Sequence, residues 1–195
     1  MPRLLERIVT VPLETSHGVF RIDVTPRGLA AVRFPQQRKK AVPRRLSYRG
    51  IAGKVWRYFK DPRKPVGSIP LDLSGHTTFE KRVYGALRHV PPGRTITYAA
   101  LARRAGYPGA ARAVGTAMRK NRVPIVVPCH RVLPARGGLG GYAAGRSWKR
   151  FLLEREHAHG IRATRTERRM YKRSFTVCRQ RGAQVCRSRS RHAVV

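Results

Sequence analysis

An apolar run at residues 123–127 ends in the tetrapeptide Pro128-Cys129-His130-Arg131. The run predicts a buried strand, which would hold Cys129 at its end with a base and a cation beside it. A thiol is a strong nucleophile only as its thiolate, and a neighbouring base or positive charge favours that form. On the cysteine alone, a small buried hydrophobic residue is the more common interpretation.

The net charge of the chain limits the classes of partner that it is expected to bind. Its 195 residues include 43 Lys and Arg against 9 Asp and Glu, which gives a net charge of +34. Such a charge predicts a polyanionic partner, with nucleic acid first and an anionic membrane surface second. No apolar run reaches the roughly 18 residues of a membrane span, and the first residues lack the apolar core of a signal peptide. Three cysteines favour a reducing compartment over a disulfide framework, so we expect a cytoplasmic protein, associated with the nucleoid if prokaryotic.

Hydrophobic periodicity predicts a β-rich first part and a helical second part. The elements predicted for the first part are strands at 8–11, 19–24, 29–34 and 66–73 and a helix from a Ser47 cap to about Lys60. The second part is predicted to contain four helices, at 79–87, at 98–105 after a Thr97 cap, at 110–119 and at 148–156 after a Ser147 cap. We therefore expect three segments, an N-terminal domain at 1–75, a second domain at 76–160 and a tail at 161–195.

The tail contains eleven Lys or Arg and one Glu, few apolar residues and no clear period. This composition predicts a disordered basic arm that adds sequence-independent affinity for DNA. Cys178 and Cys186 lie there, and their spacing does not match a zinc module.

Two short helices joined by the turn at 106–109 are typical of a helix-turn-helix, although many helical hairpins of this form bind nothing. The second helix is built largely of alanine and glycine, which leaves Arg112 as the long side chain of its first turns. Small residues allow a helix backbone to approach closely in a narrow groove, where Arg112 would act as a wedge. The alternative is a solvated arginine on a basic helix.

The segment 121–132, preceded by Ala111-Arg112-Ala113-Val114-Gly115 and followed by Gly140-Gly141-Tyr142-Ala143, resembles the O6-alkylguanine-DNA alkyltransferases. These proteins are also called methylated-DNA–protein-cysteine methyltransferases. The resemblance covers roughly residues 79–157. It implies an α/β (α+β) fold, in which a small ribonuclease-H-like N-terminal domain precedes a mostly helical, winged-helix-like domain with a helix-turn-helix.

The resemblance also implies a function in DNA repair. A monomer would bind double-stranded DNA containing alkylated guanine, flip the base and transfer the alkyl group from O6-alkylguanine, or from O4-alkylthymine, to Cys129. Each molecule would react once and need no cofactor or metal, and no membrane partner is implied. The zinc-binding Cys and His cluster of some relatives has no counterpart near the N-terminus.

Five residues match the reactive set of the family. The resemblance makes Cys129 the nucleophile and methyl acceptor, His130 its base through a water, and Glu156 the group that orients His130. Tyr98 would donate a proton or hydrogen bond to the departing base, and Asn121 would brace the turn. Four of them also have a structural alternative: Tyr98 as a packed tyrosine, Asn121 as a helix-ending residue, His130 as a buried histidine and Glu156 as a surface acid.

Further residues match the DNA-binding and substrate contacts of the family. On the second helix of the motif, Arg112 would be the finger that fills the space left by the flipped base. The other predicted DNA contacts are Ala111, Gly115 and Arg119. The predicted substrate pocket consists of Pro124, Val132, Tyr142 and Ala143, with backbone carbonyls of Cys129 and Val132 accepting from the guanine amino group. Several relatives carry serine at the place of Ala143, so a hydroxyl contact to the base is missing.

Two other functions stay open on the sequence. One is an alkyltransferase-like protein that binds the lesion without transfer, but relatives of that type lack the cysteine that Cys129 supplies. The other is a basic DNA-binding regulator in which Cys129 is inert.

Overall fold

Residues 8–35 and 49–156 are described by the computed structural model. The first part is an antiparallel meander of β1 (Val9–Thr15), β2 (Gly18–Thr25) and β3 (Gly28–Arg33), followed by α1 (Gly50–Lys60). Strand β1 is longer than the predicted strand at 8–11. Strand β1 pairs only with β2 and is an edge strand of the sheet. Pro12 does not interrupt it, because an edge strand tolerates a missing N–H donor.

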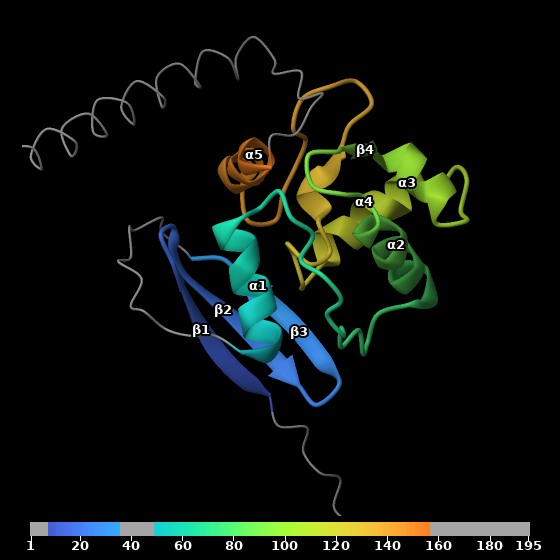
Figure 1. Cartoon of the computed structure of the whole chain (residues 1–195). Helices are drawn as coiled ribbons and strands as arrows, with labels where there is room; N and C mark the ends of the chain where they lie inside the picture. The colour runs from blue at the N-terminus through green and yellow to red at the C-terminus, as the bar shows by residue number, and fades with distance from the viewer. Residues whose placement is uncertain (1–7, 36–48, 157–195) are drawn as a thin grey trace, which may run out of the picture. The chain divides into compact units, whose positions relative to one another are not determined.

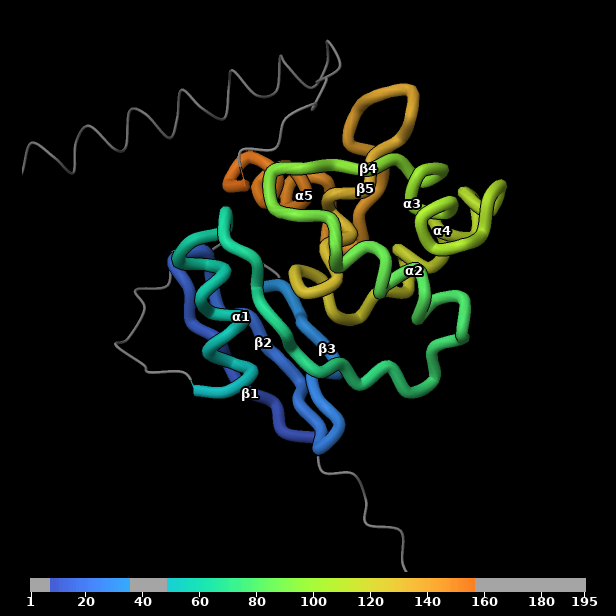
Figure 2. The backbone as a smooth tube through the Cα atoms, turned by 45° about the vertical axis from the view of Figure 1, so that its right-hand side comes forward, coloured from blue at the N-terminus to red at the C-terminus, as the bar shows by residue number. Residues whose placement is uncertain are grey.

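Helix α1 lies along this sheet in both views of the backbone (Figures 1 and 2). Phe20 of β2 is fully buried, and its ring centroid lies 4.4 Å from that of Phe59 in α1 and 5.5 Å from that of Trp148. The alternation predicted for residues 19–24 is therefore confirmed for Phe20 and Ile22. The predicted cap Ser47 lies outside the described residues, and α1 follows Arg49, which makes no side-chain cap.

The predicted strand at 66–73 is wrong. Only a single parallel bridge joins Leu71 to Leu29, with the Leu29 N–H donating to the Pro70 carbonyl at 2.9 Å. Pro70 has no N–H to extend the pairing. Gly28, at φ +138°, permits the close approach, since a Cβ there would lie 2.3 Å from the Pro70 oxygen.

The second part consists mainly of helices. In chain order its elements are α2 (Thr78–Arg88), β4 (Ile96–Thr97), α3 (Tyr98–Arg104), α4 (Ala111–Lys120), the 3₁₀ turn η1 (Cys129–Arg131), β5 (Val132–Leu133) and α5 (Arg146–Arg155). Thr97 caps α3 as predicted, accepting from the Ala100 N–H at 3.2 Å. Ser147 is not a cap. Helix α5 begins at Arg146, two residues before the predicted start at 148, because the Gly145 carbonyl already accepts from the N–H groups of Trp148 and Lys149.

The apolar run at 123–127 forms a turn, and the buried strand predicted there is wrong. Ile125 has φ +75°, and the Val127 N–H donates back to the Val123 carbonyl at 2.9 Å. Two prolines remove donors that a strand would need, and the Asn121 side chain closes the turn with two hydrogen bonds of its own. The run is buried, as its composition indicates, but it is compact instead of extended.

A two-residue parallel ladder joins distant parts of the site. Ile96 pairs with Val132 and Thr97 with Leu133. Tyr98 directly follows β4, and Cys129 lies three residues before the start of β5, so this short ladder fixes both on one side of the fold.

The sheet and the helical part are also connected through the backbone. The Val32 N–H of β3 donates to the Arg122 carbonyl at 2.8 Å, just after α4. The described residues, 8–35 and 49–156, belong to one compact unit, and the domain boundary at 75/76 stays a prediction. The predicted basic tail, with Cys178 and Cys186, lies outside the described residues. No helix in the described ranges is long and apolar enough to cross a membrane.

Candidate active site

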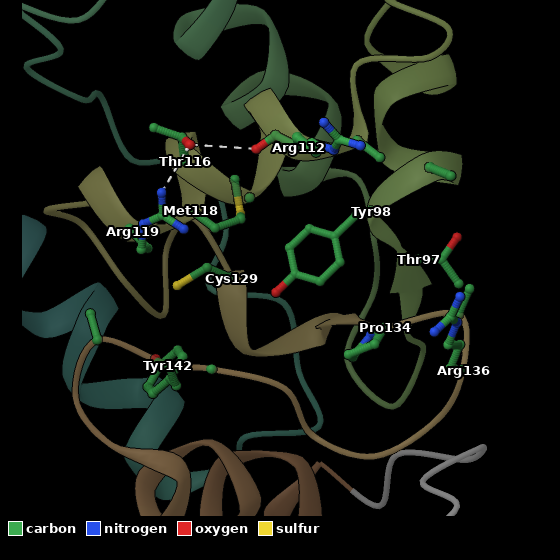
Figure 3. Close-up of a pocket in the computed structure, with 16 residues that line it drawn as sticks. Thr97, Tyr98, Arg112, Thr116, Met118, Arg119, Cys129, Pro134, Arg136 and Tyr142 are labelled. Atoms are coloured by element: carbon green, nitrogen blue, oxygen red, sulfur yellow. Dashed lines mark hydrogen bonds between the residues drawn. The ribbon is translucent and has the colours of Figure 1, made fainter.

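A cavity of about 1080 Å³ opens between α3, α4 and the loop at 134–143 (Figure 3). Residues of all three segments line it, and Cys129 contributes from the turn beneath α4. The predicted site residues in the lining are Tyr98, Ala111, Arg112, Gly115, Arg119, Cys129, Tyr142 and Ala143. Met118, Pro134 and Arg136 are further lining residues that the sequence had not suggested.

Cys129 is a free thiol with 7% of its surface exposed. Burial raises the pKa of this thiol, while interactions with Asn121 and Tyr142 and the charge of Lys149 oppose the rise. The protonated thiol is therefore the resting form, and a base must remove its proton before it can attack. The next residue in the chain, His130, carries an imidazole, a group that can accept such a proton.

His130 is fully buried behind Cys129 and does not line the cavity. Its Nε2 lies 2.9 Å from Glu156 Oε1. Although burial would raise the pKa of Glu156, hydrogen bonds and charges from His130 and Arg131 lower it to about 2. An ionised carboxylate only accepts, so His130 carries its hydrogen on Nε2 and presents a lone pair on Nδ1. Nδ1 has no hydrogen-bond partner within the described part of the chain.

Arg131 completes the ion cluster behind the thiol. It is 4% exposed, donates from Nε at 2.9 Å to Glu156 Oε2 and from Nη2 at 2.8 Å to Oε1. Its Nη1 donates to the Val90 carbonyl at 2.5 Å. These two hydrogen bonds to Glu156 fix the plane of its carboxylate. Arg131 therefore orients Glu156 toward His130.

Tyr98 stands at the start of α3, with its hydroxyl end directed toward Cys129 (Figure 3). Burial first, and then the proximity of Cys129, raise the pKa of Tyr98, so its hydroxyl is protonated at neutral pH and able to donate. Gly115 of α4 lies against the ring, since a Cβ there would be 3.9 Å from Tyr98 Cε1. The small residues of α4 thus accommodate this tyrosine.

Asn121 braces the chain that leads into η1 (Cys129–Arg131), the reactive turn. Its Nδ2 donates to the Val127 carbonyl at 2.9 Å, and its Oδ1 accepts from the Val123 N–H at 3.0 Å. These two bonds hold the chain immediately before Pro128. Asn121 acts on the site through this backbone and does not itself line the cavity.

The outer wall of the cavity is formed by α4. Arg112 and Arg119 are exposed there, and the Arg112 side chain lies away from Cys129 (Figure 3). Thr116 Oγ1 donates to the Arg112 carbonyl at 3.4 Å and accepts from Arg119 Nη2 at 3.0 Å. The wall therefore presents two cations and several small residues to whatever enters the cavity.

The facing wall is the loop at 134–143. The Tyr142 hydroxyl is buried near the Cys129 thiol, and burial followed by the proximity of Cys129 raises the pKa of Tyr142 well above its usual range. Gly140 has φ +66°, and a Cβ there would lie 2.9 Å from Pro134 Cγ. Val132 and Pro124 are buried and absent from the lining, in contrast to Tyr142 and Ala143.

Two buried residues that sequence reasoning missed support these groups. Lys149 of α5 is fully buried, its Nζ donates to the Val132 carbonyl at 2.7 Å, and burial lowers its pKa to about 8. Tyr58 of α1 donates to Glu156 Oε1 at 2.8 Å. The sequence contains a signal for Lys149, because this lysine lies beside Trp148 in an apolar stripe. Nothing in the local sequence distinguishes Tyr58 from an ordinary packed tyrosine.

No cluster of His, Cys, Asp or Glu that could hold a metal ion occurs in residues 8–35 and 49–156. A thiol, an imidazole and a carboxylate lie together at this site, from Cys129, His130 and Glu156. This arrangement suits activation of a buried nucleophile for a single displacement.

Comparison with known proteins decides the family. Residues 78–158 match the family model described as the DNA binding domain of 6-O-methylguanine DNA methyltransferase. A methylated-DNA–protein-cysteine methyltransferase from Methanosarcina acetivorans is 39% identical over 135 residues, which is 66% of this chain and 85% of that protein. This chain belongs to the methylated-DNA–protein-cysteine methyltransferase family. A second methyltransferase of this name, from Shigella flexneri, is 41% identical over 107 residues, 55% of this chain.

The match to the Shigella methyltransferase spans 62% of that protein, less than two thirds of its length. Among solved structures, the crystal structure of Mycobacterium tuberculosis OGT in complex with DNA is 33% identical, with a TM-score of 0.61 over 75% of this chain and 91% of that one. The likeness therefore extends beyond the DNA binding domain into the sheet. The mixed α/β fold expected for a methyltransferase of this family is confirmed, while its finer description is not tested.

Proposed function

We propose that this protein repairs DNA by moving the alkyl group of O6-alkylguanine to Sγ of Cys129, once per molecule. The observation that carries the proposal is the buried hydrogen bond between His130 Nε2 and Glu156 Oε1, directly behind a thiol that lines a large cavity. Family membership supplies the reaction class. No cofactor or metal is part of the proposal.

The reaction begins with loss of the thiol proton. Nδ1 of His130 accepts it through a bridging water, and Glu156 stabilises the imidazolium that results. Sγ of Cys129 then attacks the alkyl carbon as the bond from that carbon to O6 of guanine breaks. The Tyr98 hydroxyl donates to the departing base, which leaves as guanine. The products are a thioether on Cys129 and a repaired base, and nothing in the site regenerates the thiol.

Helix α4 carries the residues that we propose contact DNA. We propose that the helix-turn-helix of α3 and α4 enters the minor groove, that Arg112 fills the gap left by the flipped nucleotide, and that Arg119 contacts the backbone. Ala111 and Gly115 allow close approach. The net charge of +34 and the DNA-bound structure of the Mycobacterium tuberculosis relative support a DNA partner.

The finer features of the protein belong to the same proposal. They are a ribonuclease-H-like sheet domain, a winged-helix-like reactive domain, a monomeric state and a cytoplasmic location, where a reactive thiol stays reduced. Ala143 and the carbonyls of Cys129 and Val132 complete the substrate pocket, whereas Pro124 is buried in the turn at 123–127 and does not line the cavity. The Val132 carbonyl already accepts from Lys149, and its second lone pair is the one that the base would use.

Mass spectrometry tests the proposal. The protein is mixed with a duplex oligonucleotide that contains O6-methylguanine, and the intact protein mass and the modified peptide are measured. We expect one methyl group per protein molecule, on Cys129, and none in Cys129→Ala. Lesion-specific binding with an unchanged mass would favour the lesion-binding alternative instead.

A further inference from the structure

Three donors from two parts of the fold meet at one oxygen of Glu156. Oε1 accepts from His130 Nε2 at 2.9 Å, from Arg131 Nη2 at 2.8 Å and from the Tyr58 hydroxyl at 2.8 Å. His130 and Arg131 belong to the reactive turn, as the family motif requires. Tyr58 belongs to α1 and is separated from Glu156 by 98 positions in the chain.

The position of Tyr58 is determined by the N-terminal sheet. It is 2% exposed, and the next residue, Phe59, packs against Phe20 of β2. Arg155 ties α5 to the same helix by donating from Nη2 to the Phe59 carbonyl at 2.8 Å. The tyrosine hydroxyl is therefore held against Glu156 by packing that is independent of the reactive turn.

The hydrogen bond has a chemical consequence for the base. A carboxylate that receives another donor spreads its negative charge over that donor, so it attracts the proton of an imidazolium less strongly. The other charged and titratable groups that act on this cluster are Arg131, Lys149, Arg155 and Tyr142, together with the Cys129 thiol. Tyr58 is the donor that can be removed there without changing a charge.

We propose that Tyr58 is a positioning residue for alkyl transfer, which holds Glu156 Oε1 against His130 Nε2 and so makes α1 a structural part of the reactive site. The inference rests on the proposed function, because it assigns Tyr58 a role in that reaction. Tyr58 does not touch the substrate and acts only through Glu156.

Removing the hydroxyl has a predictable sign. In Tyr58→Phe the charge on Oε1 is less dispersed, so the imidazolium of His130 is better stabilised and the pKa of His130 rises. The neutral imidazole is the base, so the acid limb of the transfer rate moves to higher pH. Because burial keeps the pKa of His130 below its usual range, the rate at neutral pH should change little. At pH values below that pKa the rate should fall by roughly fivefold, the equivalent of about 1 kcal/mol for one lost hydrogen bond to a carboxylate.

Tyr84→Phe is the matched control. Tyr84 is also a buried tyrosine whose hydroxyl donates one hydrogen bond, at 2.9 Å to the Ala117 carbonyl, and it does not contact Glu156. Both variants lose a buried hydroxyl, so both should be destabilised by a similar amount. Only Tyr58→Phe should change the pH dependence.

The experiment uses the full chain and two readouts. The first is the second-order rate of methyl transfer from the duplex oligonucleotide at a series of pH values. The second is the ¹⁵N NMR signal of His130, assigned by its loss in His130→Gln, which reports tautomer and pKa without any transfer. We expect an upward shift in both readouts for Tyr58→Phe and in neither for Tyr84→Phe.

An unchanged His130 titration and an unchanged pH profile in Tyr58→Phe would overturn the assignment. Should that variant fail to fold, fluorotyrosine at position 58 keeps the ring and makes a stronger donor, so the pKa of His130 should fall; no shift there would equally refute it. If the wild type transfers no methyl group, the proposed function fails, while the NMR readout still tests the link to Glu156.

Discussion

Lys149 Nζ lies 2.7 Å from the carbonyl oxygen of Val132, and this bond ties α5 to the strand that leaves the reactive turn. The same nitrogen reaches the Gly141 carbonyl at 3.5 Å. One buried ammonium thus connects the segment that carries Cys129 to the loop that carries Tyr142, and it places a positive charge near the thiol.

Replacing this lysine should slow transfer. In Lys149→Met the charge that opposes the rise of the Cys129 pKa is lost, so less thiolate forms and we expect a rate at least tenfold lower at pH 7. Lys120→Met, which removes an exposed lysine from α4, is the control for net charge. Equal rates in Lys149→Met and the wild type would show that the charge does not act on the thiol.

The same lysine predicts a pH dependence of stability. Its pKa is lowered to about 8 in the folded protein, below its ordinary value of 10.5, so the unfolded chain binds more protons between these values. The free energy of unfolding should therefore gain a contribution from Lys149 as pH rises from about 8 to about 10.5. Urea unfolding at several pH values should show this gain in the wild type and its loss in Lys149→Met.

Glu156 predicts a pH dependence of stability in the acidic range. Its pKa is lowered from 4.5 to about 2, so it stabilises the fold above pH 4.5, and this contribution is lost as pH falls toward 2. Glu156→Gln should cost about 3 kcal/mol at pH 7, because Arg131 loses its buried partner. The difference in unfolding free energy between variant and wild type should shrink on acidification; a constant difference would contradict the assigned ion cluster.

Arg112 should matter for duplex DNA alone. Arg112→Ala should reduce transfer from O6-methylguanine in a duplex by about tenfold, or roughly 1.4 kcal/mol, and leave the reaction with the free base unchanged. Arg57→Ala removes an equally exposed arginine from α1 and serves as the control. A similar loss with the free base would mean that Arg112 shapes the pocket and does not act as a finger.

Alanine substitutions at Gly140 and Gly137 distinguish the effect of backbone strain from that of steric crowding. Gly140→Ala combines a φ of +66° with a Cβ that would lie 2.9 Å from Pro134 Cγ, whereas Gly137→Ala at φ +90° meets no atom within 4 Å. Both should lose about 1 kcal/mol of stability through strain. Only Gly140→Ala should also displace the loop that carries Tyr142 and slow transfer, as measured by rates compared at equal folded fraction.

Local patterns were sufficient for the helices around the cavity. The spacing of Phe79, Val83 and Leu87 and the Thr97 cap predicted α2 and α3 closely, because both signals lie within one or two turns. The tetrapeptide at Cys129 located the reactive turn for the same reason. The short apolar run before it was predicted as a strand because hydrophobicity reports burial, and a turn with a left-handed Ile125 is buried just as well.

The supporting contacts could not be predicted from sequence. Tyr58 and Glu156 meet only when α1 and α5 pack on the same sheet, and the pairing of Lys149 with Val132 needs both α5 and β5 in place. Such contacts depend on tertiary geometry and leave no periodic trace. Ser147 shows the converse, since a good capping residue is overruled where Gly145 sets the first turn of α5.

The bond between the Val32 N–H and the Arg122 carbonyl bears on how this protein can vary. It joins the sheet to the segment before the reactive turn through main-chain atoms, which every residue except proline supplies at position 32. The side chain at position 122, which is exposed, can therefore vary over evolutionary time while the junction is retained. Val32 is 5% exposed, so a scan of all substitutions there should find proline and charged residues the least tolerated and apolar residues of similar size the best tolerated.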